Sequence, residues 1–390
     1  MILNMRYLPR SITPELKKAA KYFPSLIVTG PRRAGKTTLL RRCFPNASYH
    51  LIEDPDIIAR LRSDPRSYID SIKTPAILDE IQNVPEILNY IRSRVDQSPK
   101  KNGQWFLTGS QEAPLMQGVS ESMAGRAAIF QLLPFSQEET SKVSIFRGGF
   151  PEPLAKPIAA DMWFRSYIQT YLERDVRAIS SIRDLAMFRR FLSILASRVG
   201  QLLNRTDLAA PLGVSVPTIS EWLSILEITS QIILVQPYYE NFGKRIIKSS
   251  KIYFTDSGML CHLLGIESEQ MLFNSPFFGP IFEGFIASEI LKTQYNSGKR
   301  KELYFFRDQQ GLEVDFLIPT GNKKMILLES KASRTITPQM AYPIKRLRGY
   351  ISNYSVKSFL VHLPSGKQEI TSALVPGVKA IPSNDLDKIF

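Results

Sequence analysis

The sequence predicts an α/β fold that opens with a doubly wound parallel sheet and closes with a second α/β region. Apolar runs of strand length at 25–29, 76–78 and 105–107 are separated by stretches with helical spacing. A glycine-rich loop and then a helix follow the first run directly. Strand-like runs return at 313–318 and 325–328. The order strand, loop, helix, strand is typical of a parallel sheet covered by helices.

The loop after the first strand, Gly30 to Thr37, fits the pattern G-x-x-x-x-G-K-[ST] that binds phosphate in nucleotide hydrolases. Gly30 and Gly35 allow the backbone to curl until several N–H groups point at one anion. Lys36 is expected to reach the β- and γ-phosphates, and Thr37 to offer its hydroxyl to Mg²⁺. The residues expected to bind ATP are Gly30, Pro31, Arg32, Arg33, Ala34, Gly35, Lys36, Thr37 and Thr38.

Two carboxylates follow the apolar run 76–78. Asp79, at the end of this strand, is expected to hold Mg²⁺, directly or through water. Glu80 beside it is the natural group to orient and deprotonate the attacking water. A surface acidic pair is the alternative interpretation of these two residues. Behind a phosphate-binding loop, however, they predict an ATPase that uses ATP and Mg²⁺.

Two further positions are candidates for catalysis. The run 105–107 leads to Ser110 and Gln111, and either is expected to touch the γ-phosphate or its water, because ligands bind at the carboxyl ends of parallel strands. Arg126 precedes the apolar run 127–133 and is a candidate arginine finger for a neighbouring subunit's nucleotide site. A solvated or salt-bridged arginine is an equal alternative for Arg126.

Helical spacing resumes after the first sheet. Ser136 and Glu139 form the pattern of a capping box, which predicts a helix that starts at Pro134. The stretch 147–153 is rich in glycine and proline and marks a boundary. Aromatic and apolar residues within 160–180 then recur at helical spacing, which predicts a second helical segment.

The next segment has the element order of a winged helix-turn-helix. Helical spacing is found at 188–195, 204–212 and 216–227, and two extended runs follow at 232–239 and 251–255. Three helices followed by a β-ribbon are typical of this DNA-binding module. The face of the third helix carries no arginine or lysine, so specific guanine recognition by this helix is not expected.

Basic residues gather instead on the ribbon that follows the three helices. They suit contacts with DNA phosphates, which position a protein without specifying a sequence. A solvated hairpin tip or a contact to another subunit is the alternative interpretation. The residues expected to contact phosphates are Lys244, Arg245, Lys248 and Lys251.

A second constellation of charged residues lies in the last third of the chain. Asp315 lies on one predicted strand, and Glu329 and Lys331 follow the next one. Asp315 and Glu329, on the same-side ends of adjacent strands, can share one Mg²⁺. Lys331 lies two residues after Glu329 and so on the same strand face, where it can orient an attacking water. The preceding helix, 282–291, supplies Glu283 and Glu289, either of which can join the metal shell.

This constellation resembles the PD-(D/E)xK nucleases, which implies a metal site formed by Glu283, Asp315, Glu329 and Lys331. The basic stretches 299–301 and 345–348 can hold a DNA strand nearby. The alternative is a nuclease-like fold that no longer cuts and serves for docking or oligomerisation.

As a whole, the chain resembles the AAA family of P-loop ATPases, and more closely the bacterial and archaeal AAA-type proteins with a DUF4143 C-terminal region. The stretches that carry the resemblance are 30–38, 78–82, 107–110, 124–126, 148–152, 171–175 and 251–256. The resemblance implies ATP binding and hydrolysis, a helical lid over the nucleotide and, as is common among AAA proteins, a homo-oligomer. Candidates for a lid arginine are Arg165, Arg174 and Arg177.

Four regions follow from these motifs. They are a P-loop ATPase core at 1–133, a helical lid at 134–184, a winged helix-turn-helix at 185–258 and an α/β restriction-nuclease-like domain at 259–390. The 390 residues are long enough for several domains with their own cores.

The composition predicts a nucleic-acid partner and a cytoplasmic location. The formal net charge is +14, for which a nucleic-acid partner is the simplest reason and generic solubility the alternative. Cys43 and Cys261 are far apart and imply no disulfide framework. No run approaches the roughly 20 apolar residues of a membrane span, so a cytoplasmic protein without a membrane partner is expected.

The sequence leaves three functions open. The first is an ATP-hydrolysing, DNA-associated protein that binds branched or structured DNA in repair, recombination or defence. The second is an ATP-regulated, Mg²⁺-dependent DNA nuclease. The third is a signalling or scaffold NTPase that binds protein partners.

Overall fold

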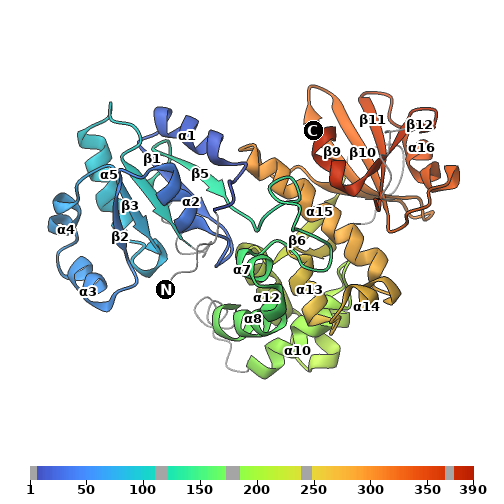
Figure 1. The fold of residues 1–390 in the computed structure, drawn as a ribbon, viewed down its shortest axis with the longest axis horizontal. Coiled ribbons are helices and arrows are strands. Elements are labelled where there is room, and N and C mark those ends of the chain that lie inside the picture. Colours follow the sequence, from blue (N-terminus) through green and yellow to red (C-terminus); the bar gives the residue numbers. More distant parts are fainter. Residues whose placement is uncertain (1–6, 110–121, 173–184, 239–247, 365–372) are drawn as a thin grey trace.

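The computed structural model describes residues 7–109, 122–172, 185–238, 248–364 and 373–390 (Figure 1). Two β-sheets lie on opposite sides of the molecule, and a group of helices lies between and below them in this view. Within the described ranges, no helix combines the length and the apolar character needed to cross a membrane.

The first sheet is parallel throughout, with the strand order β2-β3-β4-β1-β5. Its strands are β1 (Ser25–Thr29), β2 (Ser48–Leu51), β3 (Ala76–Asp79), β4 (Trp105–Thr108) and β5 (Ala127–Gln131). The strands predicted at 25–29, 76–78 and 105–107 are confirmed. Because all five run in the same direction, their carboxyl ends meet at one edge of the sheet.

Helices cover both faces of this sheet, as the doubly wound prediction requires. Alternate residues of β1 enter two separate cores, because successive side chains of a strand point to opposite faces. Leu26 and Val28 belong to the core beneath α1 and α2, and Ile27 belongs to the core beneath α3, α4 and α5. The helices are α1 (Thr13–Tyr22), α2 (Lys36–Cys43), α3 (Pro55–Ser63), α4 (Pro65–Ser71) and α5 (Ile87–Gln97).

The helix predicted to start at Pro134 is wrong. The capping-box bonds do form: Ser136 N donates to Glu139 Oε2 (3.0 Å) and Glu139 N donates to Ser136 Oγ (3.3 Å). They close only a single turn, because Glu139 also binds Arg10 and the backbone N–H of Ser11. A capping box therefore marks a local turn here, and tertiary contacts decide that no helix follows.

Two short helices and a π-helical turn follow the breaker-rich boundary. Gly149 has no room for a side chain, since a Cβ there would lie 2.1 Å from the carbonyl oxygen of Phe135. Its N–H donates to the buried Asp256 carboxylate (2.7 Å), which fastens this loop to a later helix. The elements are α7 (Pro151–Ala155), α8 (Ala160–Tyr167) and the π-helical turn Ile168–Leu172.

The three helices and two strands predicted for the middle of the chain form where they were expected. Asn204 caps α11, and Ser215 caps α12 by accepting from Thr218 N (3.2 Å). The elements are α10 (Leu185–Ala196), α11 (Arg205–Ala209), α12 (Val216–Ile228), β6 (Ile232–Pro237) and β7 (Lys251–Phe254). The assignment of this segment as a winged helix stays a prediction.

The second sheet has eight strands in the order β12-β13-β11-β10-β9-β8-β6-β7. The antiparallel pair β6–β7 is part of it, because β6 pairs with β8 through Gln236 and Tyr304. The ribbon of the middle segment therefore extends the C-terminal sheet. The remaining strands are β8 (Tyr304–Arg307), β9 (Glu313–Gly321), β10 (Lys324–Lys331), β11 (Ser355–His362), β12 (Ala373–Val375) and β13 (Val378–Pro382).

The long helix α15 (Phe278–Asn296) connects the parts of the molecule. It is buried over most of its length, and its side chains enter one core that extends from Leu133 to Ile389. The middle helices and one face of the second sheet share this core with α15. Figure 1 shows α15 between the middle helices and the second sheet, with one end near the first sheet and the other near α14. The smaller helices of this region are α13 (Ser257–Leu263), α14 (Glu269–Asn274) and α16 (Tyr342–Arg348).

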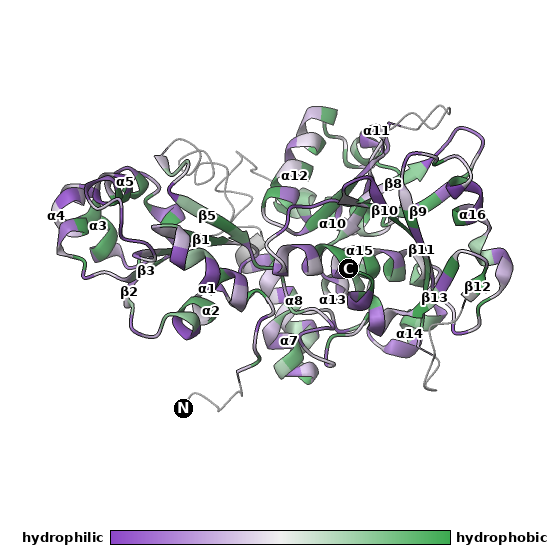
Figure 2. Cartoon of the chain, turned by 90° about the horizontal axis from the view of Figure 1, so that it is seen from above, coloured by the Kyte–Doolittle hydropathy of each residue, from purple (hydrophilic) through white to green (hydrophobic). Residues whose placement is uncertain are grey.

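Hydropathy follows this architecture. The strands of both sheets and the inner turns of the helices are largely hydrophobic, whereas α16 at the rim of the second sheet is largely hydrophilic (Figure 2). The predicted α/β fold with a parallel sheet is confirmed. A nuclease-like fold for the C-terminal region stays a prediction, as do the four domain boundaries.

Candidate functional site

The glycine-rich loop has the curled backbone that its pattern predicts. Gly30 and Gly35 both adopt positive φ angles, 134° and 97°. A Cβ on Gly30 would lie 2.1 Å from the carbonyl oxygen of Leu132, so only glycine fits there. Gly35 is the N-cap of α2, and no side chain among the described residues caps this helix end. Such an end favours phosphate.

Lys36, Thr37 and Asp79 come together in front of this loop. Lys36 is buried, and its ammonium donates to the carbonyl oxygens of Gly30 and Pro31, each at 3.0 Å. The Thr37 hydroxyl donates to Asp79 Oδ2 at 2.8 Å. A hydroxyl beside a carboxylate is an oxygen donor set that suits Mg²⁺. The structure thus brings the two residues predicted to hold Mg²⁺ into direct contact.

Glu80 is held in place by its neighbours. Its backbone is left-handed (φ 60°), which turns the side chain out of the line of β3. Glu80 Oε2 accepts from Arg32 of the loop (3.4 Å) and, at short range, from the amide of Gln82. The predicted general base therefore lies beside the phosphate loop and is ion-paired with a residue of that loop.

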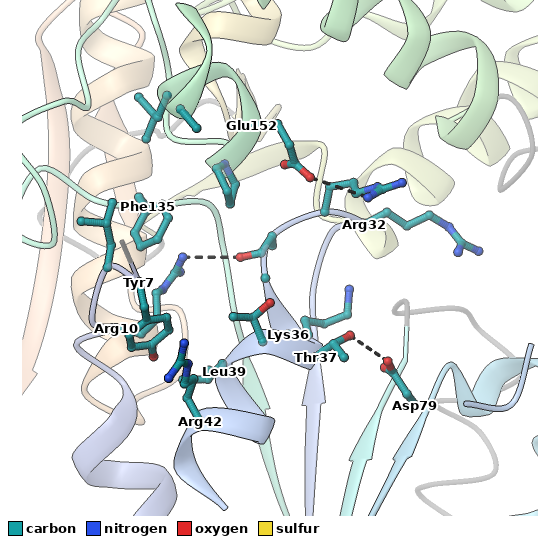
Figure 3. A pocket seen from close by; sticks show the side chains of 18 of the residues that line it. Tyr7, Arg10, Arg32, Lys36, Thr37, Leu39, Arg42, Asp79, Phe135 and Glu152 are labelled. Carbon is teal, nitrogen blue, oxygen red and sulfur yellow. Dashed lines mark hydrogen bonds and ion pairs between the residues drawn. The ribbon is translucent and has the colours of Figure 1, made fainter. Parts of the chain in front are cut away.

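A cavity of about 1010 Å³ opens in front of the loop. This is large enough for a nucleoside triphosphate. Figure 3 shows Lys36, Thr37 and Asp79 on one wall, with Tyr7 and Phe135 on the opposite side. The cavity is lined by the first sheet and by the segments that precede and follow it, so a ligand there contacts both.

Glu152 on α7 also belongs to the site. It lies in the stretch 148–152, but the sequence predicted no role for it. It lines the cavity opposite the loop, and its carboxylate lies 3.7 Å from the guanidinium of Arg33 (Figure 3). Burial raises the pKa of Glu152, and Arg33 acts in the opposite direction. Its Oε2 atom has no hydrogen-bond partner among the described residues. A second acidic group thus faces the phosphate loop from across the cavity.

Arg10 and Tyr49 also contact residues of the site, although no sequence motif predicted a role for them. Arg10 donates to the carbonyl oxygens of Ala34 (3.4 Å) and Leu133 (2.5 Å), and its guanidinium lies over the ring of Phe135. It thereby holds the N-terminal segment against the loop. The Tyr49 hydroxyl donates to Asp79 Oδ2 at 2.8 Å, and burial followed by this bond raises the pKa of Tyr49.

The structure tests only one of the other two predicted catalytic residues, Ser110 and Arg126. Ser110 lies outside the described residues, and so does Gln111. Arg126 lies at the start of β5, the edge opposite to the phosphate loop, and forms a partly exposed ion pair with Asp96 (2.6 Å). Arg126 is therefore unable to serve its own chain's cavity, and a role in a neighbouring subunit stays a prediction. Of the candidate lid arginines, only Arg165 is described; it is exposed and pairs with Asp161 at 3.0 Å.

The C-terminal constellation does assemble. Asp315 on β9 accepts from the backbone N–H and the hydroxyl of Ser330 on β10, each at 2.8 Å. Lys331 donates to Glu329 Oε1 at 2.7 Å. Glu283 of α15 lies near both carboxylates, and Asp315 acts electrostatically on each of them. The alternative residue Glu289 does not join; it accepts from the backbone N–H of Gln137 at 2.8 Å.

The pKa values of two of these carboxyl groups are raised, because the groups are buried and lie close together. Burial and then the charge of Asp315 raise the pKa of Glu283 to about 7, and Lys251 opposes this shift. Burial and then Asp315 raise the pKa of Glu329 to about 8, opposed by Lys331. Perturbed carboxyl groups of this kind are frequent at functional sites and in buried ion-pair networks alike.

The prediction that Lys251 contacts DNA phosphates is wrong. Its side chain is 2% exposed and pairs with Glu283 at 2.8 Å and, more closely, with Glu313. Burial alone would lower the pKa of Lys251, but these carboxylates and Asp315 raise it above its usual value. The charge pattern of the ribbon did not reveal that one of its lysines faces inward.

The other three residues predicted to contact phosphates are not buried in the described part of the chain or lie outside it. Lys244 and Arg245 lie outside the described residues, and Lys248 is exposed. The exposed face of α12 carries Glu221 and small polar residues, as expected. The basic stretch on α16 is exposed at Lys345 and Arg348, between the exposed rings of Tyr342 and Tyr350.

Comparison with known protein families divides the chain into three parts. Residues 22–141 match the family described as AAA domain. Residues 138–270 match a domain of unknown function, DUF8612, and residues 278–385 match the domain of unknown function DUF4143. The AAA match contains the phosphate loop, Asp79 and Glu80, and the DUF4143 match contains Glu283, Asp315 and Glu329.

Two mycobacterial relatives of uncharacterized function, from Mycobacterium bovis and Mycobacterium tuberculosis, are each 29% identical to this chain over 385 residues. The alignment covers 96% of this chain and 82% of each relative. Among solved structures, a Walker-type ATPase of Pyrococcus abyssi is 16% identical, with a TM-score of 0.43 over 65% of this chain and 94% of that chain. A RuvB variant of Thermotoga maritima is 18% identical, with a TM-score of 0.29 over 57% of this chain and 85% of that chain.

At these TM-scores the two solved structures add no argument to the fold. The family matches do, because they fall on the same residues as the geometry described above. This chain therefore carries an AAA-type P-loop ATPase domain followed by a C-terminal DUF4143 domain.

Proposed function

We propose that this protein hydrolyses ATP and acts on DNA, which it binds through basic surfaces outside the AAA domain. The observation that carries the ATPase part is the direct contact between Thr37 and Asp79 in front of the phosphate loop, with Glu80 beside them. Asp79 and Glu80 come from the end of β3 and Thr37 from the start of α2, which is the arrangement that phosphoryl transfer to water requires.

Each residue has a definite task in this reaction. Lys36 and the N–H groups at the start of α2 hold the phosphates and neutralise their charge. Thr37 and Asp79 would hold Mg²⁺, which when bound neutralises charge that develops on the phosphate oxygens. Glu80 orients the attacking water and accepts its proton. The ion pair with Arg32, which ends on Oε2, holds this carboxylate beside the phosphate loop.

The contacts around the cavity support a link between nucleotide and the rest of the chain. Phe135 lines the cavity, and its carbonyl oxygen accepts from Lys292 of α15 at 3.0 Å. Glu289 of the same helix binds the backbone of Gln137. A ligand that displaces Phe135 would therefore move α15, which carries Glu283 next to Lys251 of the second sheet.

Charge and exposed side chains support DNA as the partner. The formal net charge is +14, and the α16 surface combines Lys345 and Arg348 with the exposed rings of Tyr342 and Tyr350. Basic groups bind the phosphate backbone, and tyrosine rings offer faces on which bases stack. Lys248 adds an exposed charge on the ribbon side. These contacts favour recognition of backbone and shape over sequence.

ATP turnover measured with and without duplex, single-stranded and four-way DNA tests the proposal. We expect one DNA form to stimulate turnover and to bind in a gel shift at moderate salt. The double variant Lys345→Ala/Arg348→Ala should weaken binding and lower the slope of log K against log salt by about 2. Lys18→Ala, an exposed lysine on α1, is the matched control. Absence of both binding and stimulation for every form would contradict the DNA part.

A second candidate is an ATP-regulated, Mg²⁺-dependent nuclease. The observation in its favour is that Glu283, Asp315, Glu329 and Lys331 gather at one end of β9 and β10. Plasmid and oligonucleotides incubated with Mg²⁺ or Mn²⁺ test it, with Asp315→Ala and Lys331→Ala as controls. If no substrate is cut, this candidate is removed.

A scaffold NTPase is favoured by the non-basic face of α12, where Glu221 is exposed. Stoichiometric capture of a protein partner, together with a turnover rate that no DNA changes, would select this function over the other two.

A further inference from the structure

Lys251 is the most deeply buried cation of the second sheet's carboxylate region. It begins β7, and its side chain is 2% exposed. Its ammonium contacts the carboxylates of Glu283 on α15 (2.8 Å) and, more closely, Glu313 on β9, and lies 5.6 Å from the ring centre of Phe305. A lysine is almost never buried to this extent unless it is paired. Its position is therefore set by these carboxylates.

The carboxylates around Lys251 already have partners. Glu283 Oε1 accepts from Lys251 and from the hydroxyl of Tyr253. Both bonds from Ser330 end on Asp315 Oδ2. Glu329 Oε1 accepts from Lys331. One oxygen of each of these three carboxylates is thus engaged by a protein donor.

The residues present do not fit a resident divalent metal. Within the described ranges, no three His, Cys, Asp or Glu side chains form a group that could hold a metal ion. Adding a dication next to the Lys251 and Lys331 ammonium groups would also place three cations in one small region. Like charges at such separations repel strongly where water is excluded. One observation favours a metal instead. Glu329 Oε2 is buried and has no hydrogen-bond partner among the described residues.

We propose that the Lys251 ammonium is the resident cation of this carboxylate cluster and occupies the place that a divalent metal takes in a metal-dependent nuclease. The C-terminal domain then holds its buried carboxylates without a metal and has no metal-assisted route for cutting DNA. The inference bears on the second candidate function only and leaves ATP hydrolysis untouched.

The ion pairs of Lys251 connect the middle segment of the chain to the C-terminal region. Lys251 comes from the ribbon of the middle segment, whereas Glu283 and Glu313 come from α15 and β9 of the C-terminal region. The ammonium therefore joins three elements that are separate along the chain. Removing one partner of a buried ion pair leaves an uncompensated charge, which is strongly destabilising. The cluster thus fixes the ribbon to the C-terminal sheet.

Binding of Mn²⁺ to the full chain without nucleotide tests the proposal, with free Mn²⁺ followed by its electron paramagnetic resonance signal. The variants are Asp315→Asn, Lys251→Met, the double variant of these two, and Asp79→Asn to separate any uptake at the phosphate loop. We expect the wild type and Asp315→Asn to take up Mn²⁺ equally. Lys251→Met should bind Mn²⁺ at least about tenfold more tightly, because the competing ammonium is gone and its carboxylates remain.

The gain in Lys251→Met should disappear when Asp315→Asn is added. Uptake by the wild type that is lost in Asp315→Asn but kept in Asp79→Asn would overturn the proposal, because it would reveal a metal in the cluster. A folded Lys251→Met chain without any gain would overturn it as well. Should Lys251→Met fail to fold, the comparison of wild type with Asp315→Asn still decides between the two occupants.

Discussion

The phosphate loop and the C-terminal carboxylate cluster handle buried charge in opposite ways. At the loop, Lys36 and backbone N–H groups face a cavity of about 1010 Å³ that is open to a ligand. In the cluster, Lys251 lies among Glu283 and Glu313, and the chain itself supplies the balancing charge. The first arrangement is built to receive an anion from solution, and the second is closed.

This difference teaches what a charged motif does and does not imply. Both sites carry the residue types of a catalytic centre at suitable spacing. Only the partners that arrive from elsewhere in the chain decide whether such a centre stays open. The following experiments sharpen or break this comparison, from the largest expected effect to the smallest.

Glu80→Gln should lower ATP turnover by about 10²–10⁴-fold while nucleotide binding stays intact, since only the proton acceptor is lost. Single-turnover hydrolysis and nucleotide titration measure the two effects separately. Glu86→Gln, an exposed glutamate at the start of α5, is the matched control and should hydrolyse normally. Normal turnover in Glu80→Gln would mean that another carboxylate activates the water.

Lys251→Met should lower the free energy of unfolding by about 3–5 kcal/mol, because it leaves the buried carboxylates of Glu283 and Glu313 without their cation. Urea unfolding followed by circular dichroism measures the change. The exposed Lys248→Met, three residues earlier, should change it by less than about 0.5 kcal/mol. Equal, small effects of both changes would show that the Lys251 ion pairs add little.

Because the pKa of Glu329 is raised to about 8, the free energy of unfolding should depend on pH. Between the ordinary glutamate pKa of 4.5 and about 8, the folded chain keeps this proton, whereas the unfolded chain releases it. The resulting stabilisation is fully present below pH 4.5 and is lost as the pH rises toward 8. Glu329→Gln should therefore flatten the fall of unfolding free energy across this window, and the exposed Glu267→Gln should not. Parallel pH curves for wild type and Glu329→Gln would contradict the shift.

Arg126→Ala should have the smallest effect on an isolated chain. Its ion pair with Asp96 is partly exposed, and the residue lies at the edge of the sheet away from the phosphate loop. Turnover of the dilute chain should stay within about twofold of the wild type. A loss that grows with protein concentration would support an arginine finger between subunits. The same loss at every dilution would place its role within one chain.

The phosphate site could be predicted because its parts are local. The loop from Gly30 to Thr37 is contiguous, and its glycines are required by backbone angles that other residues rarely adopt. Asp79 and Glu80 follow a buried strand of a parallel sheet, whose carboxyl edge is common to all strands. Spacing alone thus placed the principal residues. Glu152 escaped because its approach depends on how α7 folds back over the cavity.

The C-terminal cluster could be predicted only in part. Asp315, Glu329 and Lys331 lie on adjacent strands, and alternation along the strands places them together. Lys251 enters from a segment more than sixty residues away, because β6 joins the sheet beside β8. A pattern of exposed basic residues does not reveal which of them turns inward. Similarly, the Ser136–Glu139 capping box predicted a helix, but contacts with Arg10 leave only a turn.

Calorimetric titration of the full chain with ATP and Mg²⁺ tests the central claim most directly. We predict uptake of one nucleotide per chain and an affinity about 100-fold lower in Lys36→Ala, which removes the charge that faces the phosphates. The exposed Lys18→Ala should bind as the wild type does. A well-folded wild-type chain that takes up no nucleotide would contradict the claim.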